Sequence, residues 1–308
     1  MSLKKTLLKY PFTHTIVFWR DYFSGMIDYT FRKKEALRSR FVRKCKYEPD
    51  FEHPRTYNEK LQWLKLHWRD PQAELCADKV EVRRYVAEKG YADALIPQLG
   101  VYSSAKEIDF SALPEKFVLK GAHSSGMVSL CRDRSTFDEK SAIAQCRRWF
   151  KLNYYYYSGE WVYKKLKKRV IAEQYLETED GAPPCDYKIY CFHGEPKCVM
   201  VASGRMENTL CMDFFTPQWK QFPVKRHNPN SKTPPEKPET LPQMLDMARD
   251  LSAPFPHARV DLYSIKGKIW FGEITFFPAT GMQPFEPHEY DLLFGSWLDL
   301  ERVKKQNG

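Results

Sequence analysis

Two apolar runs flank a loop of small polar residues in the segment Phe117-Val118-Leu119-Lys120-Gly121-Ala122-His123-Ser124-Ser125-Gly126-Met127-Val128-Ser129-Leu130-Cys131. The runs favour two strands joined by the loop. Small residues let backbone N–H groups approach a phosphate closely, and a lysine at the strand end can offset its negative charge. The G-x-x-x-x-G-K-[ST] order of a Walker loop is absent. Taken alone, the segment fits a Gly/Ser hairpin turn as well as a phosphate loop.

A second expected hairpin, residues 259–275, carries two carboxylates. Alternate residues of a strand share a face, so Asp261 and Glu273 lie opposite each other only if the connecting loop is odd in length. We expect a three-residue loop at 266–268, with Gly267 in a left-handed conformation. Facing carboxylates repel unless a cation lies between them, and Mg²⁺ prefers oxygen ligands. The apolar and aromatic neighbours of Glu273 disfavour a merely solvated acid, and we therefore predict a metal site.

A third segment, the apolar strand expected at 170–176, is interrupted by Glu173 and Gln174. A strand edge with a carboxylate and free backbone groups can bind an adenine amine and ring nitrogen. An edge strand that exposes its polar face explains these residues more simply. Ten residues further on, Asp186 begins an expected hairpin, 186–203, which sets Lys188 on the same face as other alternate residues.

The remaining elements complete an α+β pattern. The segment 56–59 has the S/T-x-x-E form of a capping box and predicts a helix. Further helices are expected at 78–89, ending at Gly90, and at 137–150. Residues 217–242 hold much of the proline and predict a long loop. Together with the hairpins, these elements indicate an α+β protein with at least two antiparallel sheets.

The composition is that of a basic globular protein. The 308 residues include 49 Lys+Arg and 39 Asp+Glu, a formal net charge of +10, and 43% of them are apolar. This much apolar material argues against disorder across the whole chain. The positive charge could serve nucleic acid, an anionic membrane surface or phosphorylated substrates, and charge alone does not choose among them.

The cysteines and the hydropathy pattern bear on location. None of the eight cysteines lies in a C-x-x-C pair and no histidine pair has zinc-site spacing, so we expect no structural zinc. Scattered cysteines in a chain of this length are typical of buried thiols in a reducing compartment. Charged residues interrupt the most hydrophobic early stretch, 11–29, and we expect neither a membrane span nor a secretory signal. The expected location is the cytoplasm.

Two aromatic segments each have two interpretations. Residues 1–50 combine Lys and Arg with apolar residues at near-helical spacing, which predicts a helical cap on the main body or a peripheral anchor on anionic lipid at the inner face of the cytoplasmic membrane. The tyrosine run 154–157, with Trp161, could form a lid that stacks on sugar rings or a packed crossover.

In this order, the segments resemble an ATP-grasp enzyme. FVLKGAHSSGMVSL resembles the lysine and flexible loop that cover the triphosphate, IAEQYLE the adenine hinge, and RVDLY…GEITFFPATG the metal-binding end of the C-terminal sheet. The closer match is the TupA-like branch, associated with cell-surface polysaccharide biosynthesis, through TYNEKLQWLKL, ADKVEVRRYV, DYKIYCFHGEPK and GEITFFPATGM. The resemblance extends over residues 56–297, and residues 1–50 lie outside it.

The resemblance implies an ATP-grasp fold, in which two α+β subdomains grip ATP between antiparallel sheets. We expect a basic helical extension at 1–55 and a pre-grasp region at 56–115. The small subdomain, with the phosphate loop and adenine hinge, would span 116–180, and the C-terminal subdomain, with the metal site, 181–308.

The resemblance also implies nucleotide contacts. Lys120 would bind the α and β phosphates, and the loop 121–127 would close over the β and γ phosphates through backbone amides. Glu173 would face the adenine amino group, the backbone at 175–176 the ring nitrogen, and Asp186 the ribose. The expected nucleotide-binding residues are Lys79, Lys120, Gly121, Ser124, Ser125, Gly126, Met127, Glu173, Gln174, Tyr175, Leu176, Asp186 and Lys188, with Arg83 as an alternative to Lys79.

Metal and catalytic roles follow in the same way. Asp261 and Glu273 would hold Mg²⁺, with Mn²⁺ as an alternative. Thr275 stands where D-alanine–D-alanine ligase-like members carry an asparagine ligand, and its hydroxyl is a weaker one. Arg259 would steady the transferred phosphoryl group or the acyl-phosphate oxyanion. Lys120 is expected to be catalytic as well as nucleotide-binding. His123 is the candidate for the base that takes the proton of the amine.

The implied reaction is ATP-dependent amide formation from a carboxylate through an acyl phosphate, resting on positioning and electrostatics. For the TupA-like branch this suggests attachment of an amino acid or similar amine to the uronic acid carboxylates of a surface glycan. The alternatives are a sugar kinase, a glycosyltransferase of polysaccharide assembly, and a non-catalytic nucleic-acid-binding protein. None of these accounts for Asp261 and Glu273 together with the Lys120 loop, and we expect no nucleic acid partner.

Overall fold

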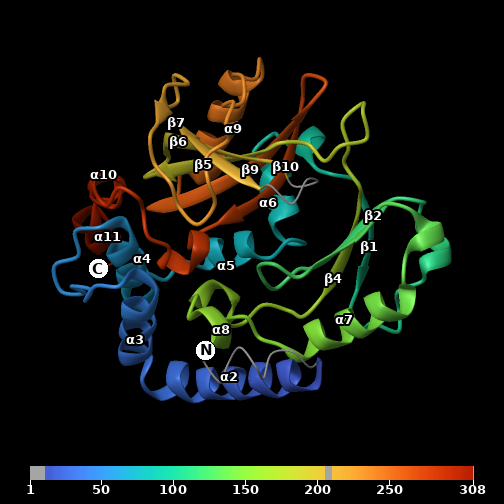
Figure 1. Ribbon diagram of the computed structural model, residues 1–308, viewed down its shortest axis with the longest axis horizontal. Coiled ribbons are helices and arrows are strands. Elements are labelled where there is room, and N and C mark those ends of the chain that lie inside the picture. Colours follow the sequence, from blue (N-terminus) through green and yellow to red (C-terminus); the bar gives the residue numbers. More distant parts are fainter. Residues whose placement is uncertain (1–10, 205–209, 308) are drawn as a thin grey trace.

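Two antiparallel sheets form the frame of the computed structural model, which describes residues 11–204 and 210–307 (Figure 1). The four-stranded sheet has the order β1-β4-β2-β3, and the six-stranded sheet has the order β10-β9-β5-β6-β7-β8. The expected α+β class with two antiparallel sheets is confirmed. The strands are β1 (Gln98–Tyr102), β2 (Phe117–Gly121), β3 (Val128–Cys131), β4 (Val170–Gln174), β5 (Asp186–Phe192), β6 (Glu195–Ser203), β7 (Cys211–Phe215), β8 (Gln221–Phe222), β9 (His257–Ile265) and β10 (Lys268–Thr275).

Helices surround the two sheets. The α-helices are α2 (Pro11–Phe31), α3 (Lys33–Cys45), α4 (Tyr57–His67), α5 (Pro71–Ala77), α6 (Val82–Glu88), α7 (Glu139–Lys151), α8 (Tyr155–Ser158), α9 (Leu241–Ser252), α10 (Glu289–Ser296) and α11 (Leu300–Asn307). Short 3-10 turns are η1 (Ala92–Ala94), η2 (Phe110–Ala112), η3 (Arg134–Thr136), η4 (Trp161–Tyr163) and η5 (Pro278–Gly281).

The small sheet has its own core under helix α7. Phe117 and Leu119 of β2 are fully buried, and α7 turns Ala142, Cys146 and Trp149 toward them on one face. The helix begins after Asp138, whose carboxylate accepts from the Ser141 N–H at 3.0 Å. This helix matches the one expected at 137–150. The small subdomain was expected to begin at residue 116. Strand β1, which ends at Tyr102, pairs with β4, so the small sheet includes residues before that boundary.

The large sheet lies between α9 and a group formed by α4 and α10. Helix α4 begins at the predicted capping box: the Thr56 hydroxyl accepts from the Glu59 N–H at 3.2 Å, and the Glu59 carboxylate accepts from the Thr56 N–H at 3.0 Å. The first residue of α4, Tyr57, is fully buried among aromatic rings of β5, β9 and α10. This contact fixes α4 against the sheet.

One expected helix is shorter than the sequence suggested. The helix expected at 78–89 is α6, which begins only at Val82. The Asp78 carboxylate instead accepts from the Val80 N–H at 2.8 Å and pairs with Arg169 at 2.7 Å. A side chain that bonds its own backbone competes with the helix, so residues 78–81 form a turn.

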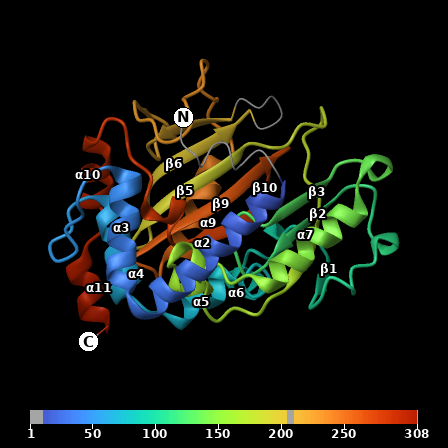
Figure 2. The same cartoon turned by 60° about the horizontal axis from the view of Figure 1, so that its bottom comes forward.

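Helix α2 lies along one side of the molecule, against α8 (Figure 2). Tyr155 of the tyrosine run is buried, and its hydroxyl donates to the Tyr29 carbonyl at 3.0 Å. The ring of Tyr156 meets Tyr22 edge-on. The tyrosine run is therefore packed beneath α2, as in the crossover interpretation, and only Tyr157 is largely exposed. No helix in the described ranges is long and apolar enough to cross a membrane.

Candidate nucleotide and metal site

Three charged side chains form one row across the large sheet. The strand register sets Lys188 of β5 opposite Asp261 of β9, and Asp261 opposite Glu273 of β10. Asp261 and Lys188 are buried, whereas the Glu273 side chain is 29% exposed. The next row is Tyr190, Arg259 and Thr275. Opposed carboxylates thus lie on adjacent strands, as the sequence predicted.

The reason for this opposition differs from the predicted one. Ile265 pairs with Lys268, so the β9–β10 loop has only two residues, Lys266 and Gly267. Both of them have positive φ. An even loop alone would set Asp261 opposite Gly272. A β-bulge between Phe271 and Glu273 supplies the odd residue and turns Glu273 onto the face of Asp261. A Cβ at Gly272 would lie 3.0 Å from the Asp261 carbonyl oxygen, so the bulge favours glycine.

Cations neutralise the buried carboxylate of the row. Arg259 donates to Asp261 twice, at 2.6 Å from Nε and at 2.7 Å from Nη2. Lys188 donates to Asp261 as well and pairs with Asp186 at 2.6 Å. Burial alone would lower the pKa of Lys188, but Asp186 and Asp261 outweigh burial and raise it. Lys188 therefore stays charged between two acids.

Glu273 has a more open environment. Its carboxylate accepts from the Thr275 hydroxyl at 3.1 Å and pairs with Lys79 at 3.1 Å and Arg259 at 3.6 Å. Burial would raise the pKa of Glu273, but Lys79 and Arg259 hold that pKa well below its usual range. The Thr275 hydroxyl also accepts from Arg259 at 3.2 Å. The Glu273 carboxylate is therefore ionised and partly exposed, and the neutral hydroxyl oxygen of Thr275 lies beside it.

The expected phosphate loop reaches this row through Lys79. The Lys79 N–H donates to the Ala122 carbonyl at 3.1 Å, and its ammonium donates to the Ser124 carbonyl at 2.8 Å while pairing with Glu273. The loop closes where the Gly121 N–H donates to the Met127 carbonyl at 2.9 Å. Lys79 is thus one cation that connects the loop of the small sheet with β10 of the large sheet.

The loop residues divide by exposure. Ser125 and Gly126 are exposed at the tip, Met127 is half-buried, and Ser124 is buried. His123 is buried, not solvated as loop histidines usually are, and its Nε2 lies 3.1 Å from the Trp149 carbonyl of α7. Burial lowers its pKa. The structure therefore gives no support to His123 as the base for the amine.

The two residues expected at opposite ends of the nucleotide contact each other. The Lys120 ammonium of β2 donates to the Glu173 carboxylate of β4 at 2.6 Å. Arg83 approaches the other Glu173 oxygen at 3.4 Å and donates to the Ile96 carbonyl at 2.9 Å. Glu173 therefore lies between two cations, and both expected alternatives, Lys79 and Arg83, reach the site.

The hinge residues occupy the end of β4 and the segment after it. Gln174 is exposed, and its N–H donates to the Pro97 carbonyl at 3.0 Å. Tyr175 and Leu176 follow the end of the strand and are half-buried. Asp186, expected at the ribose, is buried beside Lys188. The sequence prediction did not include this ion pair.

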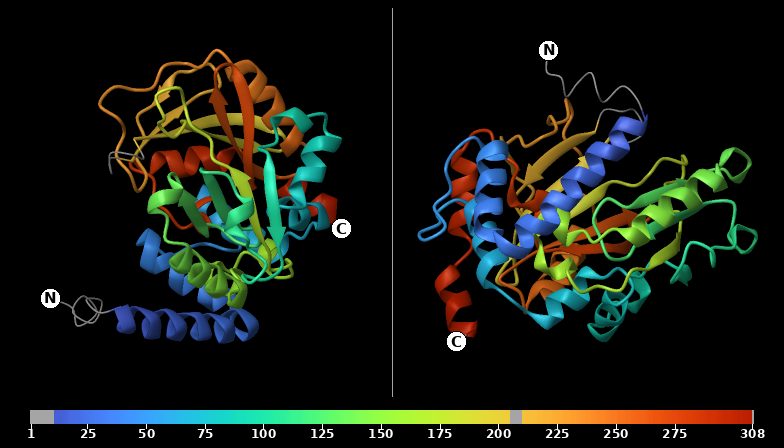
Figure 3. Two further views of the ribbon diagram at one scale, coloured as in Figure 1. Left: turned by 90° about the vertical axis from the view of Figure 1, so that its right-hand side faces the viewer. Right: turned by 90° about the horizontal axis from the view of Figure 1, so that it is seen from below.

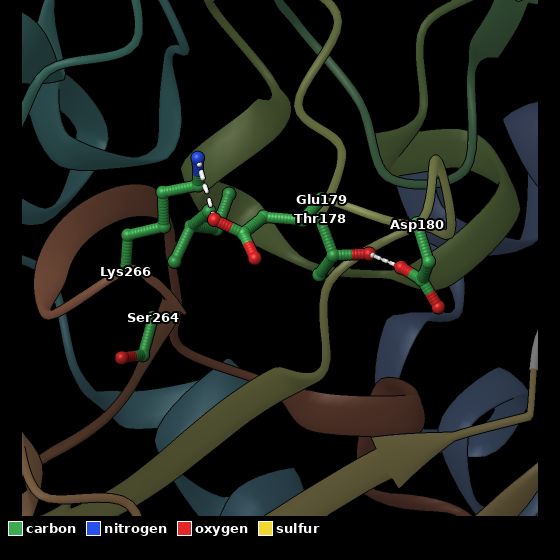
Figure 4. Close-up of a pocket in the computed structure, with 6 residues that line it drawn as sticks. Thr178, Glu179, Asp180, Ser264 and Lys266 are labelled. Carbon is green, nitrogen blue, oxygen red and sulfur yellow. Dashed lines mark hydrogen bonds and ion pairs between the residues drawn. The ribbon is translucent and has the colours of Figure 1, made fainter.

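Beyond the hinge lies an open hollow of about 730 Å³ (Figure 4). It is bordered by residues 178–180 after the hinge and by Ser264–Lys266 at the tip of the β9–β10 hairpin. Lys266 pairs with Glu179 at 2.8 Å across it. The sequence had given no sign that these two segments meet.

Sequence reasoning also missed a buried lysine and glutamate next to the site. Lys65 of α4 donates to the Ser158 carbonyl at 3.1 Å and to the Thr280 carbonyl at 2.7 Å. Burial lowers the pKa of Lys65 to about 7. Burial also raises the pKa of Glu160, which interacts with Lys65 and Glu273, to about 7. The helical pattern held a signal, because Lys65 follows Leu61 by four residues on the apolar face of α4.

The oxygen atoms of the row fit Mg²⁺. In proteins this ion is bound through one or two carboxylates, with phosphate oxygens and water completing its shell. Within residues 11–204 and 210–307, no three His, Cys, Asp or Glu side chains are placed to hold a metal ion together. Asp261 and Glu273, with the Thr275 hydroxyl beside Glu273, are the residues that would hold the ion. Both Asp261 oxygens also accept from Arg259. Phosphate oxygens of a nucleotide would complete the shell of the ion. The exposed loop tip and the cations Lys79 and Lys120 suit the triphosphate.

Comparison with known proteins gives a family and several distant structural neighbours. The family model described as TupA-like ATPgrasp matches residues 59–299, most of the chain. No curated protein matches the chain. Similar solved structures include D-alanine–D-alanine ligase from Bacillus anthracis complexed with ATP, at 15% identity over 76% of this chain and 68% of that one, with a TM-score of 0.45. D-cycloserine synthetase DcsG is 16% identical over 74% of this chain and 71% of that one, with a TM-score of 0.42. The ADP complex of the PurK N5-carboxyaminoimidazole ribonucleotide synthetase is 13% identical over 71% of this chain and 50% of that one, with a TM-score of 0.43.

Because these structural likenesses are distant, the assignment rests on the family model. That model covers the expected phosphate loop, the expected adenine hinge and the row of Lys188, Asp261 and Glu273. The chain belongs to the TupA-like ATP-grasp family, whose members are ATP-dependent ligases that use ATP with Mg²⁺.

Proposed function

We propose that the protein is a carboxylate–amine ligase that works through an acyl phosphate. The observation that carries the proposal is the link made by Lys79, which contacts the phosphate loop at Ser124 and the carboxylate row at Glu273. A nucleotide bound by the loop would have its phosphates next to two acids that can hold Mg²⁺. This combination suits phosphoryl transfer, in which positioning and charge compensation do most of the work.

The residues would divide the work as follows. Lys120 and the amides of the loop 121–127 bind the phosphates, and Asp261 and Glu273 hold Mg²⁺, which supplies charge compensation when bound. An oxygen of the substrate carboxylate attacks the γ phosphorus, the bond to the β-phosphate oxygen breaks, and ADP leaves. The amine then attacks the acyl carbon, phosphate leaves with the electron pair of the C–O bond, and the amine gives up a proton. Arg259, held by Asp261 and Thr275, would steady the oxygens that gain charge.

We propose that the carboxylate belongs to a uronic acid of a cell-surface polysaccharide, of a capsular or teichuronic type, and that an amino acid or similar amine is the donor. The support is the resemblance to the TupA-like branch, together with the net charge of +10, which suits anionic sugar substrates. We further propose cytoplasmic action with peripheral contact to an anionic membrane through residues 1–50. That contact would use a part of the molecule separate from the proposed nucleotide and metal site.

Trapping with hydroxylamine tests the reaction. The full chain is incubated with ATP, Mg²⁺, glucuronate or oligogalacturonate, and hydroxylamine in place of the amine. We expect a hydroxamate together with equal amounts of ADP and free phosphate, all lost in Lys120→Met. The control Lys116→Met changes an exposed lysine just before the same strand, and should keep the reaction.

Other products would overturn the proposal. ADP with a phosphorylated sugar and no free phosphate would identify a sugar kinase. Turnover of a nucleotide sugar without ATP would identify a glycosyltransferase. Strongly salt-dependent binding to single-stranded nucleic acid, with no turnover of ATP, would identify a nucleic-acid-binding protein.

A further inference from the structure

We propose that one face of the molecule, formed by helix α2 and the cations next to it, docks on the surface of an anionic lipid bilayer. The α2 face is defined here as Phe23, Ile27 and Phe31, together with the lysines of residues 164–168. The inference rests on the membrane contact proposed above for residues 1–50 and deepens it by naming the face that makes the contact. This face does not include the carboxylate row, so the inference does not depend on the proposed reaction.

The apolar part of this face is a stripe along α2. Phe23, Ile27 and Phe31 are 55%, 57% and 81% exposed, and their spacing of four residues sets them on one side of the helix. Trp19, one step earlier, stacks on Phe23 with ring centroids 5.8 Å apart. Large apolar side chains gathered in this way on a surface mark an interaction site.

The opposite side of α2 is fixed to the protein. Tyr22 and Tyr29 are 8% and 3% exposed, respectively. The Tyr22 hydroxyl accepts from the Asn153 N–H at 2.9 Å, and the Tyr29 carbonyl accepts from the Tyr155 hydroxyl at 3.0 Å. These hydrogen bonds fix the rotation of α2 about its own axis, so that the stripe faces away from the protein.

Cations lie next to helix α2. Asn153, which holds Tyr22, also donates to the Lys164 carbonyl at 2.8 Å, and this contact brings the segment 164–168 next to α2. Within that segment Lys164, Lys165, Lys167 and Lys168 are exposed. The end of α7 adds Arg147, Arg148 and Lys151, and Figure 3 shows α2 and α7 together on the side seen from below.

These cations are available to an external anion. Among the described residues, no ion pair joins any of the seven to an acidic side chain. Asp28, the acid nearest the stripe along α2, is itself paired with Arg32 at 2.9 Å. The face therefore combines an apolar stripe with cations that have no acidic partner among the described residues.

That combination fits a lipid surface. A helix with an apolar face and basic flanks lies in the plane of the interface, with its apolar side chains among the acyl chains and its cations at anionic headgroups. Nucleic acid would use the cations and leave the stripe in water. A second copy of the chain would cover the stripe but would bring a second set of the same cations against the first. An anionic lipid surface would bury the apolar stripe and pair with the cations at the same time.

Sedimentation with vesicles tests the proposal. The full chain is mixed with vesicles of phosphatidylcholine alone, or of phosphatidylcholine with phosphatidylglycerol. We expect binding to the anionic vesicles only. It should weaken at least about tenfold in the triple variant Phe23→Ser, Ile27→Ser, Phe31→Ser, because three large apolar side chains lose their burial.

Matched controls separate this face from general stickiness and charge. The variant Leu292→Ser, Leu293→Ser removes two other exposed apolar side chains, on α10, and should bind as wild type does. Lys164→Glu, Lys165→Glu should weaken binding, whereas Lys232→Glu, Lys237→Glu, which makes the same charge change on exposed loop lysines, should weaken it much less. Thermal melting checks that each variant folds.

Three results would overturn the proposal. One is the absence of binding to anionic vesicles by folded wild type. Another is unchanged binding by the folded triple variant, because the stripe would then have no role. The third is a concentration-dependent dimer that the triple variant abolishes while wild type ignores vesicles, which would show that a second copy of the chain covers the stripe.

Discussion

Asp261→Asn should destabilise the fold much more than Glu273→Gln, although both acids are proposed to hold the same ion. Asp261 is almost fully buried and accepts from Arg259 at 2.6 and 2.7 Å and from Lys188. The side chain of Glu273 is 29% exposed, and Lys79, its closest cation, keeps the Ser124 carbonyl when the carboxylate is lost. The three acids Asp186, Asp261 and Glu273 balance the three cations Lys79, Lys188 and Arg259, so either substitution leaves one positive charge in excess. The excess costs more in Asp261→Asn, because water reaches Glu273 but not Asp261.

The size of the effect follows from burial. Breaking a buried ion pair from one side costs about 3–5 kcal/mol, whereas the loss of a partly exposed pair costs about 1 kcal/mol. At roughly 2–4 °C per kcal/mol for a domain of this class, Asp261→Asn should melt about 6–20 °C below wild type, and Glu273→Gln about 2–4 °C below. Calorimetric melting at neutral pH measures both.

A double variant tests the physical reason. Asp261→Asn with Lys188→Met removes the surplus cation, and it should recover part of the lost melting temperature. If Asp261→Asn melts no lower than Glu273→Gln, the charge balance described for this row is wrong. If the double variant melts below the single one, the excess cation is not the cause of the loss.

Three further changes test other parts of the structure. Gly121→Val should weaken ATP binding and lower the melting temperature, because even a Cβ there would lie 2.9 Å from the Met127 side chain; calorimetric binding and melting measure this, and wild-type values for both would refute the close contact. Thr56→Val should cost about 1 kcal/mol of unfolding free energy, because it removes the hydroxyl that caps α4; urea unfolding measures it, and an unchanged midpoint would contradict the cap. Burial lowers the pKa of Lys65 to about 7, whereas a lysine in an unfolded chain has a pKa of about 10.4. Between these two values the unfolded state binds more protons than the folded state. The unfolding free energy should therefore rise as the pH increases from 7 toward 10. Lys65→Met should flatten that rise in urea unfolding at several pH values, and an unchanged slope would show that Lys65 is not the group that titrates.

The fold was readable from the sequence where local patterns were strong. The capping box at Thr56, the helix over α7, the hairpin after Asp186 and the loop between β2 and β3 all lie where the residues indicated. The pairing of Asp261 with Glu273 was also correct, but its cause was a bulge and not the loop length. A bulge adds one residue without changing the strand pattern, so hydrophobic alternation alone does not reveal it.

The parts that sequence reasoning missed depend on contacts between distant segments. His123 lies in a loop of small polar residues, which suggested an exposed side chain, but α7 returns over it and buries it. The pairing of Lys120 with Glu173 needs the β2–β4 register, which joins residues 53 positions apart. Lys65 and Glu160 are buried by three segments that meet only in the folded chain. Composition supplied the charges, and the topology decided which of them became partners.

The most direct test of the central claim is calorimetric titration of ATP with and without Mg²⁺, on wild type and Glu273→Gln. Glu195→Gln is the control, because Glu195 is an exposed acid at the β5–β6 turn of the same sheet. We predict that Mg²⁺ strengthens ATP binding by wild type and by Glu195→Gln, and that this gain is lost in Glu273→Gln while the fold is kept. Failure of folded wild type to bind ATP, or a full Mg²⁺ effect in Glu273→Gln, would contradict the claim that the phosphate loop and the carboxylate row form one nucleotide and metal site.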